Sequence, residues 1–122
     1  MCDVSNRDDD LRATKELPPL QWWRGDQLDP LAPAELVSLR RTLVSVAVPG
    51  QRDWALAARG DAPAAIRIAL RIGAACDGFD WRLDCAASAV LLCAAEGNAA
   101  AKTALAHLRR HFLRRVRRRQ ES

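Results

Sequence analysis

The sequence predicts an all-α protein, and three observations support this fold class. Alanine, which loses no side-chain entropy in a helix, accounts for 23 of the 122 residues. β-Branched residues are sparse and never alternate with polar residues over a useful length, which argues against a sheet. Apolar residues instead recur at helical spacing, and they make up 49 % of the chain, enough for a core.

The chain divides into a tail and one domain. Residues 1–17 are polar and acidic, and we expect a flexible tail there, followed by a single helical domain over 18–122. The stretch "LPPLQWWRGDQLDP" predicts an extended segment and a turn, because it holds two prolines and Gly25. Trp22 and Trp23 are costly to expose, which favours packing on the helices. The alternative is a partner-binding pair, since Trp is favoured at interface hot spots.

About five helices are expected. Their ranges are 33–48, 52–59, a third from the Asp61 cap to about 76, 81–96 and 99–118. Pro49 and Gly50 stop the first of these, which we interpret as an N-terminal capping helix. A turn is expected over 77–80. The fourth helix is apolar nearly all the way round, so it is expected to lie in the centre of the domain.

The chain contains the same corner twice. "AARGDAPAA" at 57–65 and "AAEGNAAAK" at 94–102 place Gly60 and Gly97 at matching positions, 37 residues apart. Glycine supplies a left-handed turn, and Asp61 or Asn98 caps the helix that follows. A single hairpin of this kind cannot bury its apolar face alone. The sequence therefore predicts two stacked antiparallel helical hairpins.

These corners resemble a known repeat. "AAEGNAAAKTAL" at 94–105 is similar to the corner of Sel1-like repeats, and "LAARGDAPAAIRIAL" at 56–70 matches it less fully. The resemblance to Sel1-like and tetratricopeptide-type repeats covers about 56–108. It departs at 76–84, where "CDGFDWRLD" replaces the glycine-rich turn between repeats. The resemblance implies a scaffold, adaptor or secretion-chaperone role, with no catalytic residues to carry over.

Charge is concentrated at the C-terminal end. The net charge is +4, but residues 102–122 carry +7 and the remainder carries −3. The last helix is amphipathic: its apolar stripe consists of Leu105, Leu108, Phe112 and Val116, and its opposite face carries Arg110, Arg114, Arg117 and Arg118 together with His107 and His111. Such a face can neutralise phosphates, meet an acidic partner or simply be solvated.

No catalytic pattern stands out. His107 and His111 have the spacing of helical metal sites, with Cys85 opposite, but neighbouring arginines repel a cation. No Ser-His-Asp or glycine-rich phosphate pattern is present. We therefore expect no enzyme activity, no metal and no cofactor.

The sequence also predicts the compartment. The N-terminus lacks a signal peptide, and the longest uncharged stretch, 85–95, is far shorter than a membrane span. The four cysteines, none in CxxC spacing, are expected to be reduced and packed. We thus expect a cytoplasmic protein, and its preference for Arg over Lys hints at a GC-rich bacterial genome.

The most direct functional hypothesis is a non-catalytic module that binds another protein as an adaptor, chaperone or inhibitor. Its expected contact residues are Trp22 and Trp23 and the charged stripe of Arg67 and Arg71 on the third helix. The alternative is a nucleic-acid-binding accessory protein that uses the arginines of the last helix.

Overall fold

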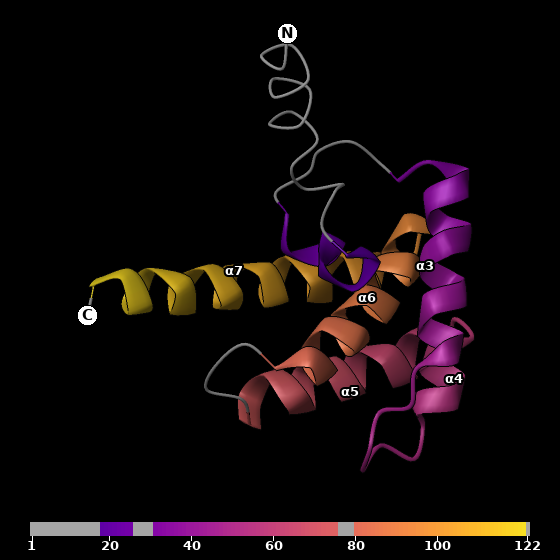
Figure 1. Cartoon of the computed structure of the whole chain (residues 1–122), viewed down its shortest axis with the longest axis horizontal. Helices are drawn as coiled ribbons and strands as arrows, with labels where there is room; N and C mark the ends of the chain where they lie inside the picture. Colours follow the sequence, from indigo (N-terminus) through magenta and orange to yellow (C-terminus); the bar gives the residue numbers. More distant parts are fainter. Residues whose placement is uncertain (1–17, 26–30, 76–79, 122) are drawn as a thin grey trace, which may run out of the picture.

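The computed structural model describes residues 18–25, 31–75 and 80–121, and every regular element within them is helical (Figure 1). The elements are the 3₁₀ helix η1 (Pro19–Arg24) and the α-helices α3 (Pro33–Ser45), α4 (Trp54–Ala58), α5 (Ala62–Ala75), α6 (Trp81–Ala95) and α7 (Ala99–Glu121). The all-α prediction is confirmed for this part of the chain. This part of the chain contains one helix in addition to the five expected, the 3₁₀ helix η1. The predicted tail at 1–17 and most of the predicted turn at 77–80 lie outside the described residues.

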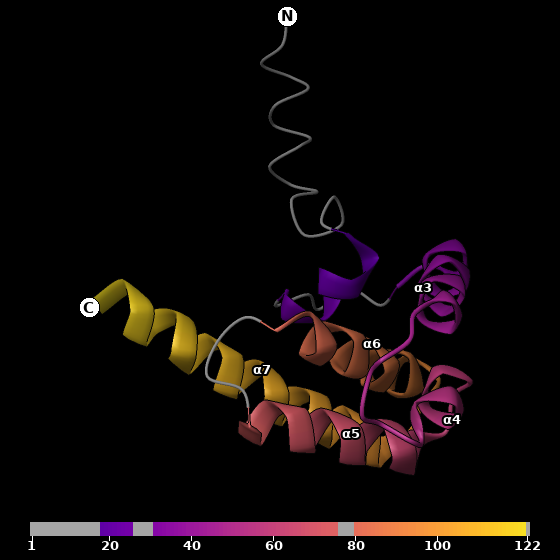
Figure 2. The same ribbon diagram turned by 60° about the horizontal axis from the view of Figure 1, so that its bottom comes forward.

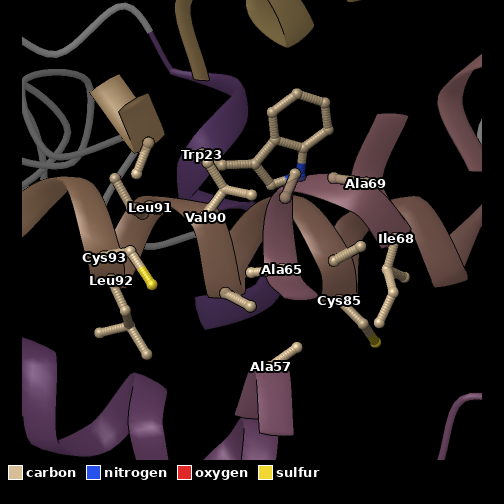
Figure 3. Packing of buried hydrophobic residues seen from close by; sticks show 14 of the residues in the cluster. Trp23, Ala57, Ala65, Ile68, Ala69, Cys85, Val90, Leu91, Leu92 and Cys93 are labelled. Atoms are coloured by element: carbon tan, nitrogen blue, oxygen red, sulfur yellow. The ribbon is translucent and has the colours of Figure 1, made fainter. Parts of the chain in front are cut away.

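Helix α6 forms the centre of the fold. It contacts every other described element, and all its side chains from Leu83 to Ala94 are buried. This confirms the prediction of a central position, because a helix that is apolar all round must be covered on all sides. Many of its side chains are small, so its neighbours approach closely. Figure 3 shows Ala65 and Ala69 of α5 near Cys85 and Val90 of α6.

Helices α5, α6 and α7 meet around a glycine. A Cβ atom built on Gly73 would lie 3.6 Å from Leu108 of α7 and 3.7 Å from Leu83 of α6. Both are ordinary van der Waals distances, so the three helices converge here with room for a methyl group. The C-terminal part of α7 extends beyond the other helices in both views (Figures 1 and 2). The last helix thus has one part packed on the body and one part that projects from it.

Residues 19–24 form the 3₁₀ helix η1, so the prediction of an extended segment is wrong for these residues, whereas 26–30 lie outside the described residues. Pro19 occupies the first turn of η1, a position where the missing N–H of proline costs nothing. Backbone hydrogen bonds from Gln21 N–H to the Pro18 carbonyl (2.8 Å) and from Gly25 N–H to the Trp22 carbonyl (3.2 Å) close the 3₁₀ turns. The two prolines favour an extended backbone, but η1 packs against α6, and this packing favours the helical conformation.

Helix α3 ends at Ser45, three residues before the predicted boundary at 48. Val46 adopts an extended conformation, and its carbonyl accepts a hydrogen bond from Trp54 Nε1 at 2.8 Å. Val48 is buried. The predicted last helical turn, 46–48, therefore does not form, because the Val46 carbonyl accepts a tertiary hydrogen bond and Val48 packs in the core. Helix α4 is correspondingly short and starts at Trp54 rather than at 52.

The two glycine corners have matching backbones. Gly60 and Gly97 have φ angles of +110° and +99°, in the region that glycine favours. The residue after each glycine donates its N–H to a carbonyl five positions earlier. Asp61 donates to the Leu56 carbonyl at 3.0 Å, and Asn98 donates to the Cys93 carbonyl at 3.1 Å. In a Schellman motif this is the hydrogen bond that spans more residues of the two. The motif satisfies the free carbonyls at a helix end. The predicted left-handed glycines are confirmed.

The two corners also have matching helix caps. The Asp61 carboxylate accepts a hydrogen bond from the Ala64 N–H at 3.0 Å, and the Asn98 side-chain oxygen accepts one from the Ala101 N–H at 2.9 Å. The predicted capping roles of both residues are therefore confirmed. The helices before the corners differ, because α4 has 5 residues and α6 has 15.

Candidate functional site

The outward side of α3 carries an exposed apolar groove. Val37 and Val44 are 51 % and 62 % exposed, whereas Leu39 and Leu43 on the inward side are fully buried. The groove has a volume of about 660 Å³ and is lined by Pro33, Leu36, Val37, Arg40, Arg41, Val44 and Ser45, which we call the α3 groove. Most monomeric proteins keep such apolar patches small, so this surface is a candidate contact site.

The α3 groove was missed by the sequence analysis. Pro33, Val37 and Val44 follow the spacing of one helix face, and this face differs from the one that buries Leu39 and Leu43. A helix with two apolar stripes signals two contact faces. The two apolar stripes of this helix could have indicated the groove, because only one of them can face the core and the other must then face outward.

The rim of the α3 groove is basic. Arg40 forms an ion pair with Glu96 at the end of α6, and Arg41 is exposed on the other side. Both members of the Arg40–Glu96 pair are about half exposed, so solvent screens the pair and it contributes little to stability.

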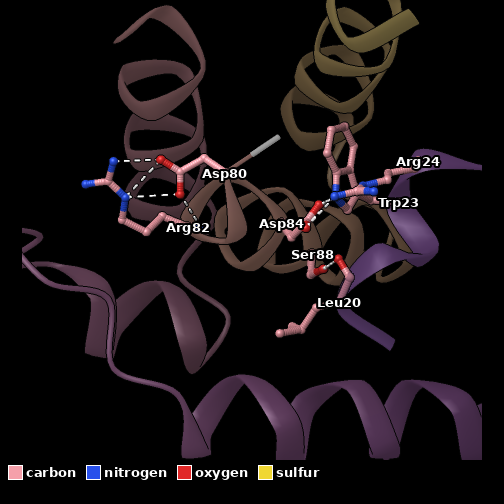
Figure 4. Close-up of polar contacts among 7 residues, drawn as sticks. All are labelled: Leu20, Trp23, Arg24, Asp80, Arg82, Asp84 and Ser88. Atoms are coloured by element: carbon pink, nitrogen blue, oxygen red, sulfur yellow. Dashed lines mark hydrogen bonds and ion pairs between the residues drawn. The ribbon is translucent and has the colours of Figure 1, made fainter. Parts of the chain in front are cut away.

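Trp22 and Trp23 are part of the core, at 8 % and 0 % exposure. Trp23 donates its indole N–H to Asp84 Oδ1 at 2.8 Å, and Arg24 donates to the same carboxylate from Nε at 2.9 Å and from Nη2 at 2.6 Å (Figure 4). Next to them, Ser88 Oγ donates to the Leu20 carbonyl at 2.9 Å. This burial supports the anchoring interpretation of the tryptophans and leaves little indole surface for a partner.

Helix α7 joins this cluster from the other side. Phe112 packs edge-on against Trp23, with ring centroids 5.3 Å apart, and the Arg24 guanidinium lies 5.2 Å from the Phe112 ring centroid. Arg109 donates from Nε to the Trp23 carbonyl at 2.7 Å. Asp84 is the residue on which the cluster converges, and it is charged although it lies in an otherwise apolar helix. A charged residue in a helix that is buried on all sides indicates an ion pair with another residue, because an unpaired charge is costly to bury.

Arg67 and Arg71 are exposed on α5 and reach a loop that precedes α4. Arg67 Nη2 lies 3.0 Å from Asp53 Oδ2, and Arg71 Nη1 donates to Gln51 Oε1 at 3.0 Å. Between them and the loop is a polar pocket of about 300 Å³, which we call the arginine pocket. Its lining residues are Gly50, Gln51, Arg52, Asp53, Arg67, Ile68 and Arg71.

The amphipathic character of the last helix is confirmed. Leu105 and Leu108 are buried, and Phe112 packs on the core. The predicted arginines, Arg110, Arg114, Arg117 and Arg118, are exposed. Arg115 differs from them, because it donates to the Gly73 carbonyl of α5 at 3.3 Å.

The histidines of α7 are not equivalent. Their rings are stacked, with centroids 6.4 Å apart, but His107 is exposed whereas His111 is partly buried, so the expectation that both face solvent is wrong for His111. Burial lowers the pKa of His111, and the nearby Arg115 lowers it further. Neither effect favours a bound cation.

Cys85 and Cys93 are buried free thiols. Burial, with a smaller contribution from Asp84, raises the pKa of Cys85 to about 11. The thiol therefore stays protonated at neutral pH, the opposite of what a metal ligand or nucleophile needs. Within 18–25, 31–75 and 80–121, no three His, Cys, Asp or Glu side chains are placed to hold a metal ion together.

Comparison with known proteins gives no match: no family pattern, no curated protein and no solved structure corresponds to the chain. None of the helices in the described part of the chain is both long enough and apolar enough to span a membrane.

Proposed function

We propose that the chain is a non-catalytic module that binds another protein, as an adaptor, chaperone or inhibitor, through the α3 groove. The observation that carries this proposal is the pair of exposed valines, Val37 and Val44, in an apolar groove on a helix whose other side is fully buried. Burying such side chains against a partner releases free energy in proportion to the apolar area covered. The arginines on the rim add orientation and partner selectivity.

The proposed scaffold is a pair of helical hairpins, α4 with α5 and α6 with α7, with α3 as the N-terminal cap. Support comes from the hydrogen bonds at Gly60 and Gly97, which match at equivalent positions. A Sel1-like or tetratricopeptide-type origin would account for this repetition and for a binding role. The proposed compartment is the cytoplasm, where buried free thiols such as Cys85 stay reduced.

The test of the α3 groove is a site-specific cross-linking experiment. A photoreactive residue at position 44 is expected to capture a protein partner from native lysate, and the same residue at position 59, on the α4–α5 corner, is not. In an affinity pull-down without the photoreactive residue, Val44→Asp should then abolish recovery of that partner. The matched control Ser38→Asp adds the same charge on α3 outside the groove and should leave recovery unchanged. Equal recovery with both variants would overturn the proposal.

A second candidate function is binding of nucleic acid by the exposed arginine face of α7. The observation that favours it is the group of exposed arginines Arg110, Arg114, Arg117 and Arg118. Contacts of this kind release counterions, so the affinity would fall steeply with salt. In fluorescence anisotropy with duplex DNA, Arg114→Glu should weaken binding for all sequences alike, and Arg59→Glu should not. Binding that is insensitive to salt, or no binding, would exclude this candidate.

A further inference from the structure

We propose that the arginine pocket binds a phosphate monoester. Three arginines, Arg52, Arg67 and Arg71, line one polar pocket between α5 and the loop at 50–53. Guanidinium is the side-chain group best matched to phosphate, because its N–H donors form a planar fork that can bind two oxygens at once. The inference does not depend on the α3 groove.

The two arginines of α5 each contact one residue of the loop. Arg67 and Arg71 are four residues apart and lie on the same side of the helix. Asp53 and Gln51 each hold one of them by a 3.0 Å contact to a single terminal nitrogen. Since a guanidinium carries five N–H donors, one such contact orients the group and leaves most of its donors for a ligand.

The loop that forms the opposite wall is also fixed. Gly50 has a φ angle of +79°, which sets the turn after Pro49. Trp54 holds the end of the loop, because its backbone N–H donates to the Gln51 carbonyl at 3.2 Å and its indole N–H donates to the Val46 carbonyl. The loop wall of the pocket is therefore set before a ligand arrives, which reduces the entropy lost on binding.

The charge of the pocket selects the ligand class. Three arginines and Asp53 give the lining a net charge of two positive units. A phosphate monoester carries about −1.5 to −2 charges at pH 7 and neutralises this positive charge. One carboxylate would leave half of the positive charge uncompensated. The volume of about 300 Å³ leaves room beside the phosphate for the group that bears it. That group is either a phosphorylated side chain of a protein or a small phosphorylated metabolite.

A titration followed by ¹H–¹⁵N NMR tests the proposal and separates the two sources. At constant ionic strength, inorganic phosphate should cause saturable shifts confined to residues 50–53 and 67–71. A phosphoserine peptide that binds more tightly than inorganic phosphate identifies a protein source, and a peptide that binds no more tightly identifies a small phosphate. The unphosphorylated peptide should cause no shifts. Shifts that do not saturate, or that spread over all arginines, would overturn the proposal.

A matched pair of variants completes the test. Arg71→Gln should weaken phosphate binding at least about tenfold, because it removes a fixed guanidinium from an exposed position that the core does not need. Arg59→Gln removes the same charge from an exposed position outside the pocket and should leave the affinity within about twofold. Equal weakening by both variants would show only general charge attraction. Val44→Asp should leave phosphate binding unchanged, so the α3 groove and the arginine pocket can fail independently.

Discussion

Asp84 of α6 accepts a hydrogen bond from the indole N–H of Trp23 at 2.8 Å, across 61 positions of the sequence. The same carboxylate pairs with Arg24 at 2.6 Å, and its residue is only 6 % exposed. A buried carboxylate is tolerated only when it is paired and hydrogen-bonded. This contact therefore helps to fix η1 on the central helix, together with the hydrogen bond from Ser88 to the Leu20 carbonyl.

The first prediction concerns this carboxylate. Asp84→Asn keeps the shape of the side chain but removes the negative charge that faces the partly buried guanidinium of Arg24. We expect a loss of about 3 kcal/mol in the free energy of unfolding, measured by urea denaturation. Glu96→Gln, which breaks the exposed pair with Arg40, is the control and should cost about 1 kcal/mol or less. Equal losses for the two variants would contradict a stabilising role of the cluster.

Much of the fold was predictable because it is encoded locally. Gly60 with Asp61 and Gly97 with Asn98 specify a stop and a cap within two residues, and both corners form as expected. The burial of α6 follows from its composition. Asp84 was not predictable as the centre of a cluster, because its partners lie some 60 residues earlier. A sequence pattern on one helix cannot show which distant side chain will reach it.

The candidate surfaces were predictable to different degrees. The periodicity of α7 alone separates exposed Arg114 from buried Leu108. In α3 the periodicity gives two apolar stripes, and only the tertiary packing decides that Leu43 is buried and Val44 is exposed. The contacts of Arg67 and Arg71 with the loop at 50–53 depend on how the chain returns after α3, which has no local signature.

The second prediction concerns the glycine corners. Gly60→Ala and Gly97→Ala should each cost about 1–2 kcal/mol, because both positions have positive φ angles although no atom lies within 4 Å of the added Cβ. Gly73→Ala is the contrasting variant. It lies within α5 at ordinary contact distances, so we expect it to be neutral or to stabilise by about 0.5–1 kcal/mol. Thermal unfolding of the three variants measures the difference, and an unaffected Gly97→Ala would contradict the strained-turn explanation.

The third prediction separates stability from binding on α3. Val44→Asp should change the free energy of unfolding by only about 0.5 kcal/mol, because the side chain is already 62 % exposed. Leu43→Ala, one position earlier but fully buried, should cost about 2–5 kcal/mol. Urea denaturation of both variants checks this. A large destabilisation by Val44→Asp would mean that the groove is packed in solution and is no free surface.

The fourth prediction concerns thiol reactivity. With a pKa of about 11, Cys85 holds only about 0.1 % thiolate at pH 8, and the side chain is fully buried. Its reaction with a disulfide reagent, followed residue by residue by mass spectrometry, should be slow in the native protein and fast in urea. The native rate should fall further under conditions that stabilise the fold, since modification requires opening. Equal rates in buffer and in urea would contradict the burial of this thiol.

The fifth prediction is a pH dependence that originates at His111. Burial and, after it, the charges of Arg115 and His107 lower the pKa of this imidazole below its ordinary value of 6.5. The unfolded chain therefore binds a proton near pH 6.5 that the folded chain does not yet bind, so stability falls as pH decreases from about 6.5. Above about pH 7.5 the group is neutral in both states and contributes no slope. Comparison of the free energy of unfolding at pH 7.5 and 5.5 should show a smaller decrease for His111→Asn than for the natural chain. His107→Asn, at an exposed position, should keep most of the decrease, and an identical decrease in the natural chain and His111→Asn would place the pH sensitivity elsewhere.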